Sequence, residues 1–508
     1  MSILRSVTAL AVAFSLNLAL AGCMVGPDYK KPPPATAPTP EFKETSDSVF
    51  RPALPRDTID RGPWWSVYGD PTLDKLMAQV DVSNQTLKEN EAAYRQAVAL
   101  IRQTQSQLYP TLGYTGSTLQ RSVGGGTSTT GTSSGSVGNS VGQFSVGGSL
   151  SWEIDLWGRI RRTIESDAAA AQASAGTLAA ARLSIQSSLA INYFSLRVSD
   201  RRRRLYEESV AAYARSLAIV NNQAAAGTVS KLDQMQAQTI YDQTRAQLVA
   251  EGVTRAQFEH AIAALIGKSP GEVSIAPEPL PPTVPTIDAG IPSALLERRP
   301  DIASAERNMA AANAQIGIAV AAYYPDITLG SSITFASTML STLFTIGSAV
   351  WSIGPQLTGT LVDGGARSAQ VEGARANYDK TVAAYRQTVL TAFQQVEDGL
   401  VQQRLAEQQE KVQEGAVAAA REAERLSLNQ YRAGTIPYTT VIQTLTSALS
   451  AEQTLINVRL TRFSASATLV TALGGGWRAQ DLPVPAQTPS SDPTPSPSAP
   501  KKRSWWPF

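Results

Sequence analysis

Two segments of the chain alternate between apolar and small polar residues. From Phe144 to Ile154, every second residue is apolar or Gly, and the residues between them, from Gln143 to Glu153, are Ser, Gly, Gln or Glu. The alternation returns from Trp351 to Leu361, where Ser, Gly, Gln and Thr fill the positions between. Because successive side chains of a strand point to opposite faces, each segment predicts a strand with one apolar and one polar face.

Each of these strands follows a shorter alternating segment that is expected to pair with it, Leu112 to Ser117 and Ile327 to Phe335. The strands are about ten residues long, which is the length that a tilted membrane-spanning strand needs. Trp152 and Trp351 are expected at matching places, as in an aromatic girdle. We interpret the polar face as lining a wet lumen and the apolar face as facing lipid. The expected lipid-facing residues are Phe144, Leu150, Trp152, Trp351, Ile353 and Leu357.

Alternation by itself is also typical of a soluble sheet that packs its apolar face on a core, so that alternative remains. Four strands cannot close a membrane barrel, and lipid does not tolerate an open sheet edge. A membrane interpretation therefore requires several chains to combine their strands. Two chains would give a barrel too narrow for a conduit, and three or more would not.

The body of the chain is an internal repeat, which is read from short motifs that recur in the same order. The spacing between copies is 215 residues for the first motif and 207 or 208 for the others, because the first copy has a longer Ser/Thr/Gly-rich loop. The recurring pairs are Tyr109-Pro110 with Tyr324-Pro325, Asp155–Arg159 with Asp363–Arg367, Ala226-Gly227-Thr228 with Ala433-Gly434-Thr435, and Ile266-Gly267 with Leu473-Gly474.

Each copy predicts a first helix, two strands, and a pair of long helices joined at an Ala-Gly-Thr turn. The first helices are expected at Leu87–Leu108 and Ile302–Ala322. The segments from Arg159 to Ala226 and from Arg367 to Ala433 contain no Pro and are rich in good helix formers. At 1.5 Å per residue, each would be roughly 100 Å long. Helices of that length indicate a coiled or tubular assembly rather than a globular domain.

The first 22 residues resemble a secretory signal peptide, with Arg5 ahead of an apolar run that is too short to span a bilayer. The run ends in Leu20-Ala21-Gly22-Cys23, which resembles a bacterial lipobox. The resemblance implies cleavage before Cys23, a diacylglycerol on its sulfur and an acyl chain on its new amino group. Residue 24 is Met rather than an inner-membrane-retaining Asp, which favours the outer membrane. An ordinary signal peptide with a chance Cys is the alternative.

Composition excludes most enzyme chemistry. The 508 residues include one His and one Cys, so neither an intrachain disulfide nor a four-ligand zinc site is expected, and no cofactor is expected. Only 17% of residues are charged and the net charge is +2, which argues against a nucleic-acid partner. The run Arg201 to Arg204 is expected to pair with Glu207 and Glu208 on a polar helix face, rather than to bind nucleic acid or lipid.

The mature chain resembles the outer-membrane efflux family, the TolC-like channel-tunnels, and within it the NodT-type lipoprotein branch. The resemblance covers Cys23 to about Gly475 and rests on several motifs. These are the lipobox, Val25-Gly26-Pro27-Asp28-Tyr29, Trp64-Trp65, Tyr68-Gly69-Asp70-Pro71 with Leu73, Arg298-Arg299-Pro300-Asp301-Ile302 with Ala305-Glu306, and Ile316-Gly317 with Tyr324-Pro325.

The resemblance implies a homotrimer in which three chains share one twelve-stranded barrel in the outer membrane, anchored there by lipid. It also implies that the long helices form a tunnel across the periplasm and meet a periplasmic adaptor protein and an inner-membrane pump. The implied function is passive passage of drugs or other small molecules. A peptide or protein secretion channel and a non-conducting structural lipoprotein are the alternatives.

Control of passage is expected at the tip of the tunnel, where the two Ala-Gly-Thr turns lie. Many relatives carry a Leu, an Asp and an Arg at the start of the last helix, and the matching positions here are Thr439, Gln443 and Thr446. A charged ring at this position is therefore not expected. Asp233 is a candidate for selectivity, or alternatively a helix-start residue stabilised by the helix dipole. The tip candidates are Gly227, Thr228, Asp233, Gly434, Thr435, Thr439 and Gln443.

The sequence thus divides into a signal peptide, an extended segment, two repeats and a tail. The signal peptide covers 1–22 and the lipidated extended segment 23–70. The first repeat covers 71–280, with its hairpin at about 111–156 and its long helices at about 158–266. The second repeat covers 281–475, with a hairpin at about 326–362 and long helices at about 366–473. A Pro/Ser-rich disordered tail is expected at 476–508.

Overall fold

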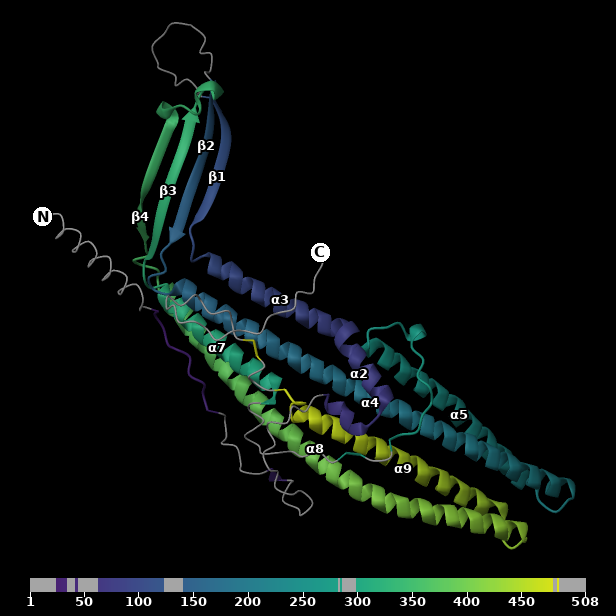
Figure 1. The fold of residues 1–508 in the computed structure, drawn as a ribbon. Helices are drawn as coiled ribbons and strands as arrows, with labels where there is room; N and C mark the ends of the chain where they lie inside the picture. The colour runs from purple at the N-terminus through teal and green to yellow at the C-terminus, as the bar shows by residue number, and fades with distance from the viewer. Residues whose placement is uncertain are drawn as a thin grey trace, which may run out of the picture.

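The molecule is elongated, with a sheet at one end and long helices running away from it (Figure 1). A computed structural model describes residues 24–33, 42–43, 63–122, 140–281, 284–285, 298–477 and 482–483. The signal peptide, Cys23, the Gly-rich loop and almost all of the tail lie outside the described residues, and what the sequence predicts for them stays a prediction.

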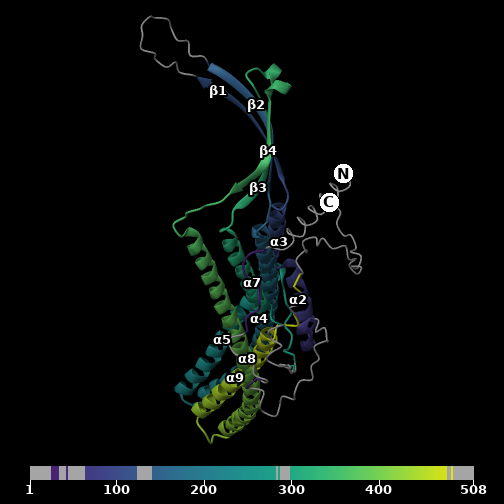
Figure 2. The same ribbon diagram turned by 90° about the vertical axis from the view of Figure 1, so that its left-hand side faces the viewer.

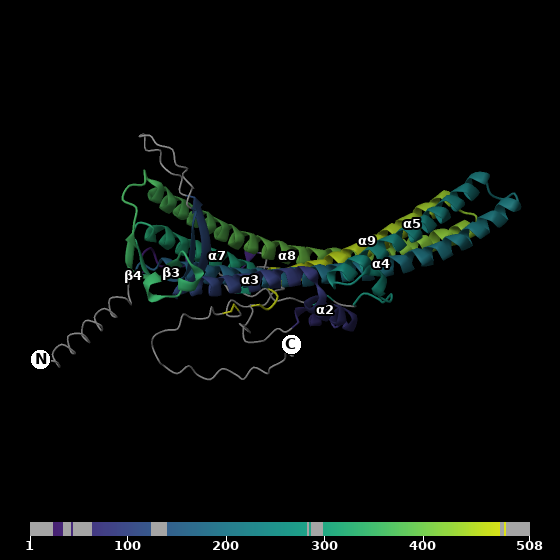
Figure 3. The same cartoon turned by 90° about the horizontal axis from the view of Figure 1, so that it is seen from above.

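Two pairs of long helices make up most of the structure. The first pair is α4 (Arg159–Ala225) and α5 (Lys231–Leu265), and the second is α8 (Ala366–Arg432) and α9 (Tyr438–Ala472). Both longer helices have 67 residues and both shorter ones have 35. The predicted long helices are confirmed to within a residue at their ends. The helices run side by side for most of their length (Figure 3).

The repeated Asp motifs start the two longer helices. Both helices have a Gly in the left-handed region as N-cap, so neither has a capping side chain there. The Asp155 carboxylate instead accepts the backbone N–H groups of Ile160 and Arg161, and Asp363 accepts that of Arg367. The hydrogen bond from the Arg367 guanidinium also holds the pKa of Asp363 below its ordinary value. Each Asp therefore satisfies helix-start donors that would otherwise lack a partner.

Three shorter helices lie against the long ones. They are α2 (Pro71–Ser83), α3 (Gln85–Ser106) and α7 (Pro300–Ala321). The sequence predicted a single first helix from Leu87, so the separate helix α2 was missed. Asn84 divides the two helices: its backbone is extended, its side-chain oxygen accepts the N–H of Leu87, and its side-chain N–H group donates to the carbonyl of Leu265. Short 3-10 turns occupy Trp64–Tyr68, Pro270–Glu272, Leu340–Thr342 and Ile346–Ser348.

The main core lies where α2, α4, α5 and α9 meet. Tyr193 and Phe194 of α4 are fully buried there and pack with Tyr68 and Phe463. The indole N–H of Trp64 donates to Gln186 of α4, so this Trp anchors the N-terminal segment on the helices. Close contact of α4 with α7 uses small residues, since a Cβ at Gly176 would lie 2.9 Å from the Pro300 carbonyl oxygen.

The four strands form one antiparallel sheet in the order β1-β2-β3-β4. They are β1 (Thr111–Ser122), β2 (Ser140–Glu153), β3 (Asp326–Ser337) and β4 (Ala349–Thr358). The sheet is twisted and stands clear of the helices (Figure 2). Among the residues that the structure describes, β1 and β4 each have a neighbouring strand on one side only, so the sheet has two open edges. Among the described helices, none combines the length and apolar character needed to cross a bilayer.

Candidate functional site

The register of the sheet places the predicted apolar residues on one face. Leu112 of β1 lies opposite Leu150 of β2, and Trp152 of β2 lies opposite Leu329 of β3. Ile333 of β3 lies opposite Trp351 of β4. Directly paired residues point to the same side of an antiparallel sheet, so the apolar positions of all four strands share a face.

The opposite face of the sheet consists mainly of small polar residues, with Glu153 and Asp326 at the end next to the helices. Cross-strand hydroxyl pairs join neighbouring strands there, with 2.8 Å between the hydroxyl oxygens of Ser117 and Ser145 and 2.9 Å between those of Ser332 and Ser352. On the apolar face, Trp351 and Leu357 are about 70% exposed in the single chain, at 71% and 69%. A soluble sheet would bury this face against its own core. The described residues provide no such cover.

One detail of the predicted aromatic girdle is wrong. Trp152 lies near the helix end of the sheet, where its indole N–H donates to the carbonyl of Leu108 at 2.9 Å. Trp152 pairs with Leu329, which in turn pairs with Pro355 of β4, so Trp152 and Pro355 lie at the same level of the sheet. Trp351 lies four residues before Pro355, toward the other end of the sheet. That separation is about 13 Å along the strand. The two Trp residues therefore do not share a level, because β2 and β4 run in the same direction and Trp152 lies near the end of β2, whereas Trp351 lies near the start of β4.

The two predicted tip turns have the same geometry. Gly227 and Gly434 both have positive φ, 72° and 73°. Thr228 and Thr435 each donate a backbone and a hydroxyl hydrogen bond to the carbonyl of the residue five positions earlier. The glycines follow the last helical residues and let the chain reverse, while the Thr hydroxyls satisfy helix-end carbonyls. A Cβ on either glycine would meet no atom within 4 Å, so the turns are open to their surroundings.

Buried tyrosines hold the helix ends together just above the turns. Tyr431 donates to Gln223 at 2.7 Å, and the hydroxyl groups of Ser216 and Tyr438 lie 3.1 Å apart. Tyr213 donates to the Leu445 carbonyl at 3.3 Å, and burial raises its pKa. These bonds connect α4 with α8 and α9, so the two turns are held relative to each other by polar contacts within an apolar cluster.

The remaining tip candidates occupy the starts of the shorter helices. Asp233 and Ser230 form a capping box, in which each side chain bonds the backbone N–H of the other. That geometry accords with the helix-start interpretation of Asp233. Thr439 and Gln443 of α9 are both exposed, one helical turn apart. The structure thus brings Gly227, Thr228 and Asp233 together at one turn and the other four candidates at the second.

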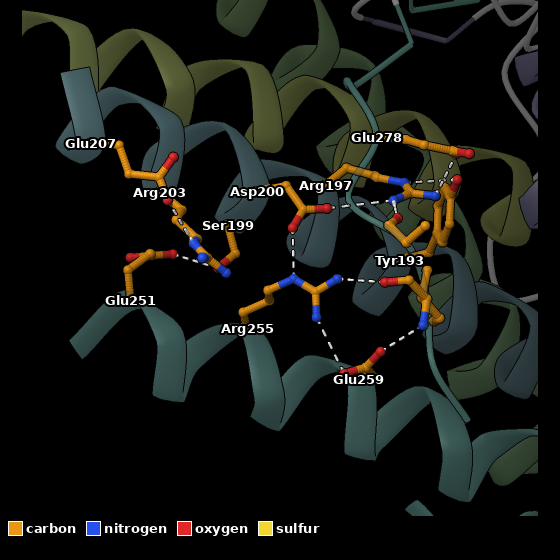
Figure 4. A network of polar contacts seen from close by, with 12 residues as sticks. Tyr193, Arg197, Ser199, Asp200, Arg203, Glu207, Glu251, Arg255, Glu259 and Glu278 are labelled. Carbon is orange, nitrogen blue, oxygen red and sulfur yellow. Dashed lines mark hydrogen bonds and ion pairs between the residues drawn. The ribbon is translucent and has the colours of Figure 1, made fainter. Parts of the chain in front are cut away.

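A network of buried ion pairs joins α4 and α5 between the tip turn and the sheet (Figure 4). The sequence did not predict this network. Asp200 of α4 has a side chain only 1% exposed and bonds the guanidinium groups of Arg197 and Arg255, at 3.4 and 2.7 Å. Arg255 of α5 also pairs with Glu259 at 3.2 Å. The network therefore ties α4 to α5 with charges that are shielded from water.

The network also fixes the segment that follows α5. Arg197 donates to the Ala276 carbonyl at 2.6 Å and pairs with Glu278 at 2.8 Å. Glu259 accepts the backbone N–H of Ile275 at 2.6 Å. Tyr193 donates to Asp70, the N-cap of α2, and its burial there raises its pKa. Nothing in the local sequence distinguishes Arg197 from the exposed Arg residues beside it, because burial here depends on distant segments.

The run Arg201 to Arg204 forms one of the ion pairs that the sequence predicted. Arg203 pairs with Glu207 at 3.0 Å on the surface of α4. Arg202 instead lies 3.8 Å from Glu251 of α5. These contacts support the expected polar helix face.

The first described residues are clamped where α4 begins. Arg162 is 2% exposed, pairs with Asp28 at 2.8 Å and donates to the carbonyls of Val25 and Gly26. The N–H of Val25 donates to the Trp157 carbonyl at 3.1 Å. The chain immediately after Cys23 is therefore fixed at the junction between the sheet and the helices.

A comparison with family models finds that residues 76–268 and 291–475 match the model described as "Outer membrane efflux protein". The two matched segments contain the two long helix pairs and the four strands.

Curated relatives match along nearly their whole length. The antibiotic efflux pump outer membrane protein ArpC of Pseudomonas putida is 30% identical over 484 residues, which are 94% of this chain and 96% of that protein. The cation efflux system protein CusC of Escherichia coli O6:H1 is 28% identical over 470 residues, covering 92% and 98%.

Solved structures have the same fold. The outer-membrane channel OprN aligns with a TM-score of 0.79 at 27% identity, over 90% of this chain and 100% of that one. The open state of the MtrE outer membrane channel of Neisseria gonorrhoeae aligns with a TM-score of 0.75 at 27% identity, over 90% and 99%.

Proposed function

We propose, from the premise that this chain belongs to the outer membrane efflux protein family, that it is the conduit through which a tripartite pump expels drugs or other small molecules. The protein is an outer-membrane efflux channel rather than an enzyme. The observation that carries the proposal is the sheet, in which one face is apolar and the other small and polar across all four strands. That arrangement suits lipid outside and water inside.

The open edges of the sheet account for the homotrimer. Since neighbouring strands in the sheet are antiparallel, β4 of one copy can pair with β1 of the next without changing that pattern. Three copies then close a twelve-stranded barrel and remove every edge, as lipid requires. The long helices continue this tube into the periplasm, where it works with an adaptor and an inner-membrane pump.

The residues proposed to face lipid are Phe144, Leu150, Trp152, Trp351, Ile353 and Leu357. Their support is the shared face and, for the β4 members, their exposure in the single chain. The tip residues are proposed to limit passage. Buried tyrosines next to the turns hold the helix ends together, and the turns at Gly227 and Gly434 themselves are open to their surroundings.

Removing the gene is expected to raise the accumulation of at least one pump substrate, and the wild-type gene is expected to restore it. A fluorescent dye and a panel of antibiotics would be measured in cells with and without the protein. Unchanged accumulation of every compound would refute efflux. Loss of secreted peptide with unchanged drug accumulation would instead favour the secretion alternative.

Cys23 is proposed to be acylated. Its support is the clamp of Val25 and Gly26 at the base of the sheet, because a lipid attached two residues earlier would lie near the level at which the barrel enters the membrane. A Cys23→Ser chain is expected to lose its lipid, worth about 0.8 kcal/mol for each buried CH₂. Mass spectrometry of the mature N-terminus would measure this, and an acylated Ser variant would contradict it.

A further inference from the structure

The start of α9 has an exposed face without a single charge. Its members recur at helical spacing, every three or four residues, and will be called the α9 face. They are Thr439, Gln443, Thr446, Ser450 and Thr454. Their hydroxyl and amide groups can exchange hydrogen bonds with water but attract neither ion sign strongly.

The charged residues of α9 point elsewhere, because each of them pairs with α8. Glu452 bonds Arg421. Arg459 pairs with Glu410 and Glu414 at 2.8 and 2.9 Å. Arg462 also reaches Glu410, at 2.5 Å. The seam between α8 and α9 therefore holds all of the charge on α9, and the uncharged face is a separate surface.

The two flanks of α8 show the same division. On one flank, the exposed residues at seven-residue spacing are Gln402, Gln409, Ala416, Ala423 and Gln430, none of which is charged. On the other flank they are Lys411, Ala418, Arg425 and Arg432. Residues seven apart lie on the same side of a coiled helix, so each set is a continuous stripe.

The basic flank lies on the side where α8 faces α4. Arg432 of this flank and the nearby Arg421 line a groove together with Glu208 and Arg215 of α4. Leu445 of α9 also lines that groove. Leu445 is buried and does not belong to the α9 face. The part of the helical layer formed by α8 and α9 consequently has a charged side, with this groove, and an uncharged side that carries the α9 face.

The uncharged side repeats the chemistry of most of the polar face of the sheet, where Ser, Thr, Gly and Gln predominate and the charged Glu153 and Asp326 lie only at the end next to the helices. We infer that the α9 face lines the tunnel and that the conduit therefore selects solutes by size and polarity, not by the sign of their charge. The inference rests on the proposed channel function. It assigns to the channel a substrate class that includes neutral, cationic and anionic small molecules alike.

Ion selectivity in planar bilayers tests the inference. Wild-type protein in a potassium chloride gradient is expected to pass both ions with similar permeability. Gln443→Asp and Gln409→Asp each place three carboxylates in the tunnel of a trimer, and should raise the ratio of cation to anion permeability severalfold, more at low salt. Ala418→Asp adds the same charge on the basic flank and should leave the ratio unchanged.

Asp233 supplies the discriminating variant, since it is a charged group at the other turn. If the wild-type channel is strongly cation-selective and Asp233→Asn removes that preference, selectivity belongs to α5 and the inference fails. Equal shifts from Gln443→Asp and Ala418→Asp would overturn it as well. In both cases a conducting channel remains, so the proposed function would stand.

Thiol labelling gives an independent measurement. The sequence has one Cys, at position 23, so Gln443→Cys and Ala418→Cys each introduce a single further thiol. A membrane-impermeant thiol reagent is expected to reduce the conductance of Gln443→Cys and to label Ala418→Cys without changing its conductance. Labelling of Gln443→Cys with unaltered conductance would place the α9 face outside the tunnel.

Discussion

Replacing Asp200 by Ala is expected to destabilise the folded chain by about 3–5 kcal/mol, the range seen when one member of a buried ion pair is removed. Asp200 has a side chain only 1% exposed, and its carboxylate bonds both Arg197 and Arg255. The variant leaves two guanidinium groups largely out of water, with Glu278 and Glu259 as their remaining carboxylate partners. Circular dichroism during heating of the purified protein would measure the loss as a lower midpoint temperature.

Glu207→Ala is the matched control, because it also removes a carboxylate from an Arg pair on α4. Glu207 and Arg203 are about half exposed, at 49% and 50%, so their pair is worth roughly 0–1 kcal/mol. The two variants should therefore differ by several kcal/mol in the free energy of unfolding. Equal midpoint temperatures for both would show that the buried network does not stabilise the junction of α4 and α5.

The second large effect is expected at Gly474, the residue that follows the C-cap of α9. Its φ is 91°, and a Cβ there would lie 2.0 Å from the carbonyl oxygen of Arg298. Gly474→Ala therefore adds left-handed strain of about 1–2 kcal/mol and a backbone clash worth about 1–3 kcal/mol more. Gly267, its counterpart in the first repeat, would place a Cβ 2.2 Å from the Ser83 carbonyl oxygen and should respond in the same way.

The tip glycines provide the control for this second prediction. Gly227 and Gly434 have φ near 72°, but a Cβ on either would meet nothing within 4 Å. Their Ala variants should lose only the left-handed strain of about 1–2 kcal/mol, without the clash. Yield of folded protein and midpoint temperature would be compared for all four Ala variants. A tip variant as damaged as Gly474→Ala would mean that the clash is relieved by movement and does not contribute.

Much of the fold follows from local patterns. The alternation in β2 and β4 predicted both faces of the sheet, because side-chain direction in a strand depends only on position along it. The absence of Pro and the recurring Ala-Gly-Thr turns located the long helices to within a residue. The tip candidates Gly227 and Gly434 were found in the same way, since a Gly with positive φ at a helix end has a local signature.

What the sequence did not reveal depends on contacts between distant segments. Arg197 and Arg203 lie six residues apart on one helix, yet one is buried and the other half exposed, because the segment around Glu278 covers only the first. The division at Asn84 was missed because that residue owes its place partly to the Leu265 carbonyl. The different levels of Trp152 and Trp351, by contrast, could have been predicted. Trp152 lies 3 residues before Asp155 and Trp351 lies 12 residues before Asp363, so the repeat does not match them.

The equal lengths of the two helix pairs determine where the two turns lie relative to each other. Both turns must end at the same depth if Tyr431 is to reach Gln223 across them. Deleting seven residues from α4 alone would withdraw one turn by about 10 Å and break that contact, whereas the same deletion in all four helices would shorten the tube and keep its end level. A single insertion or deletion should thus be tolerated only in a loop. In the helices, a change of length should be tolerated only when all four helices change by the same amount.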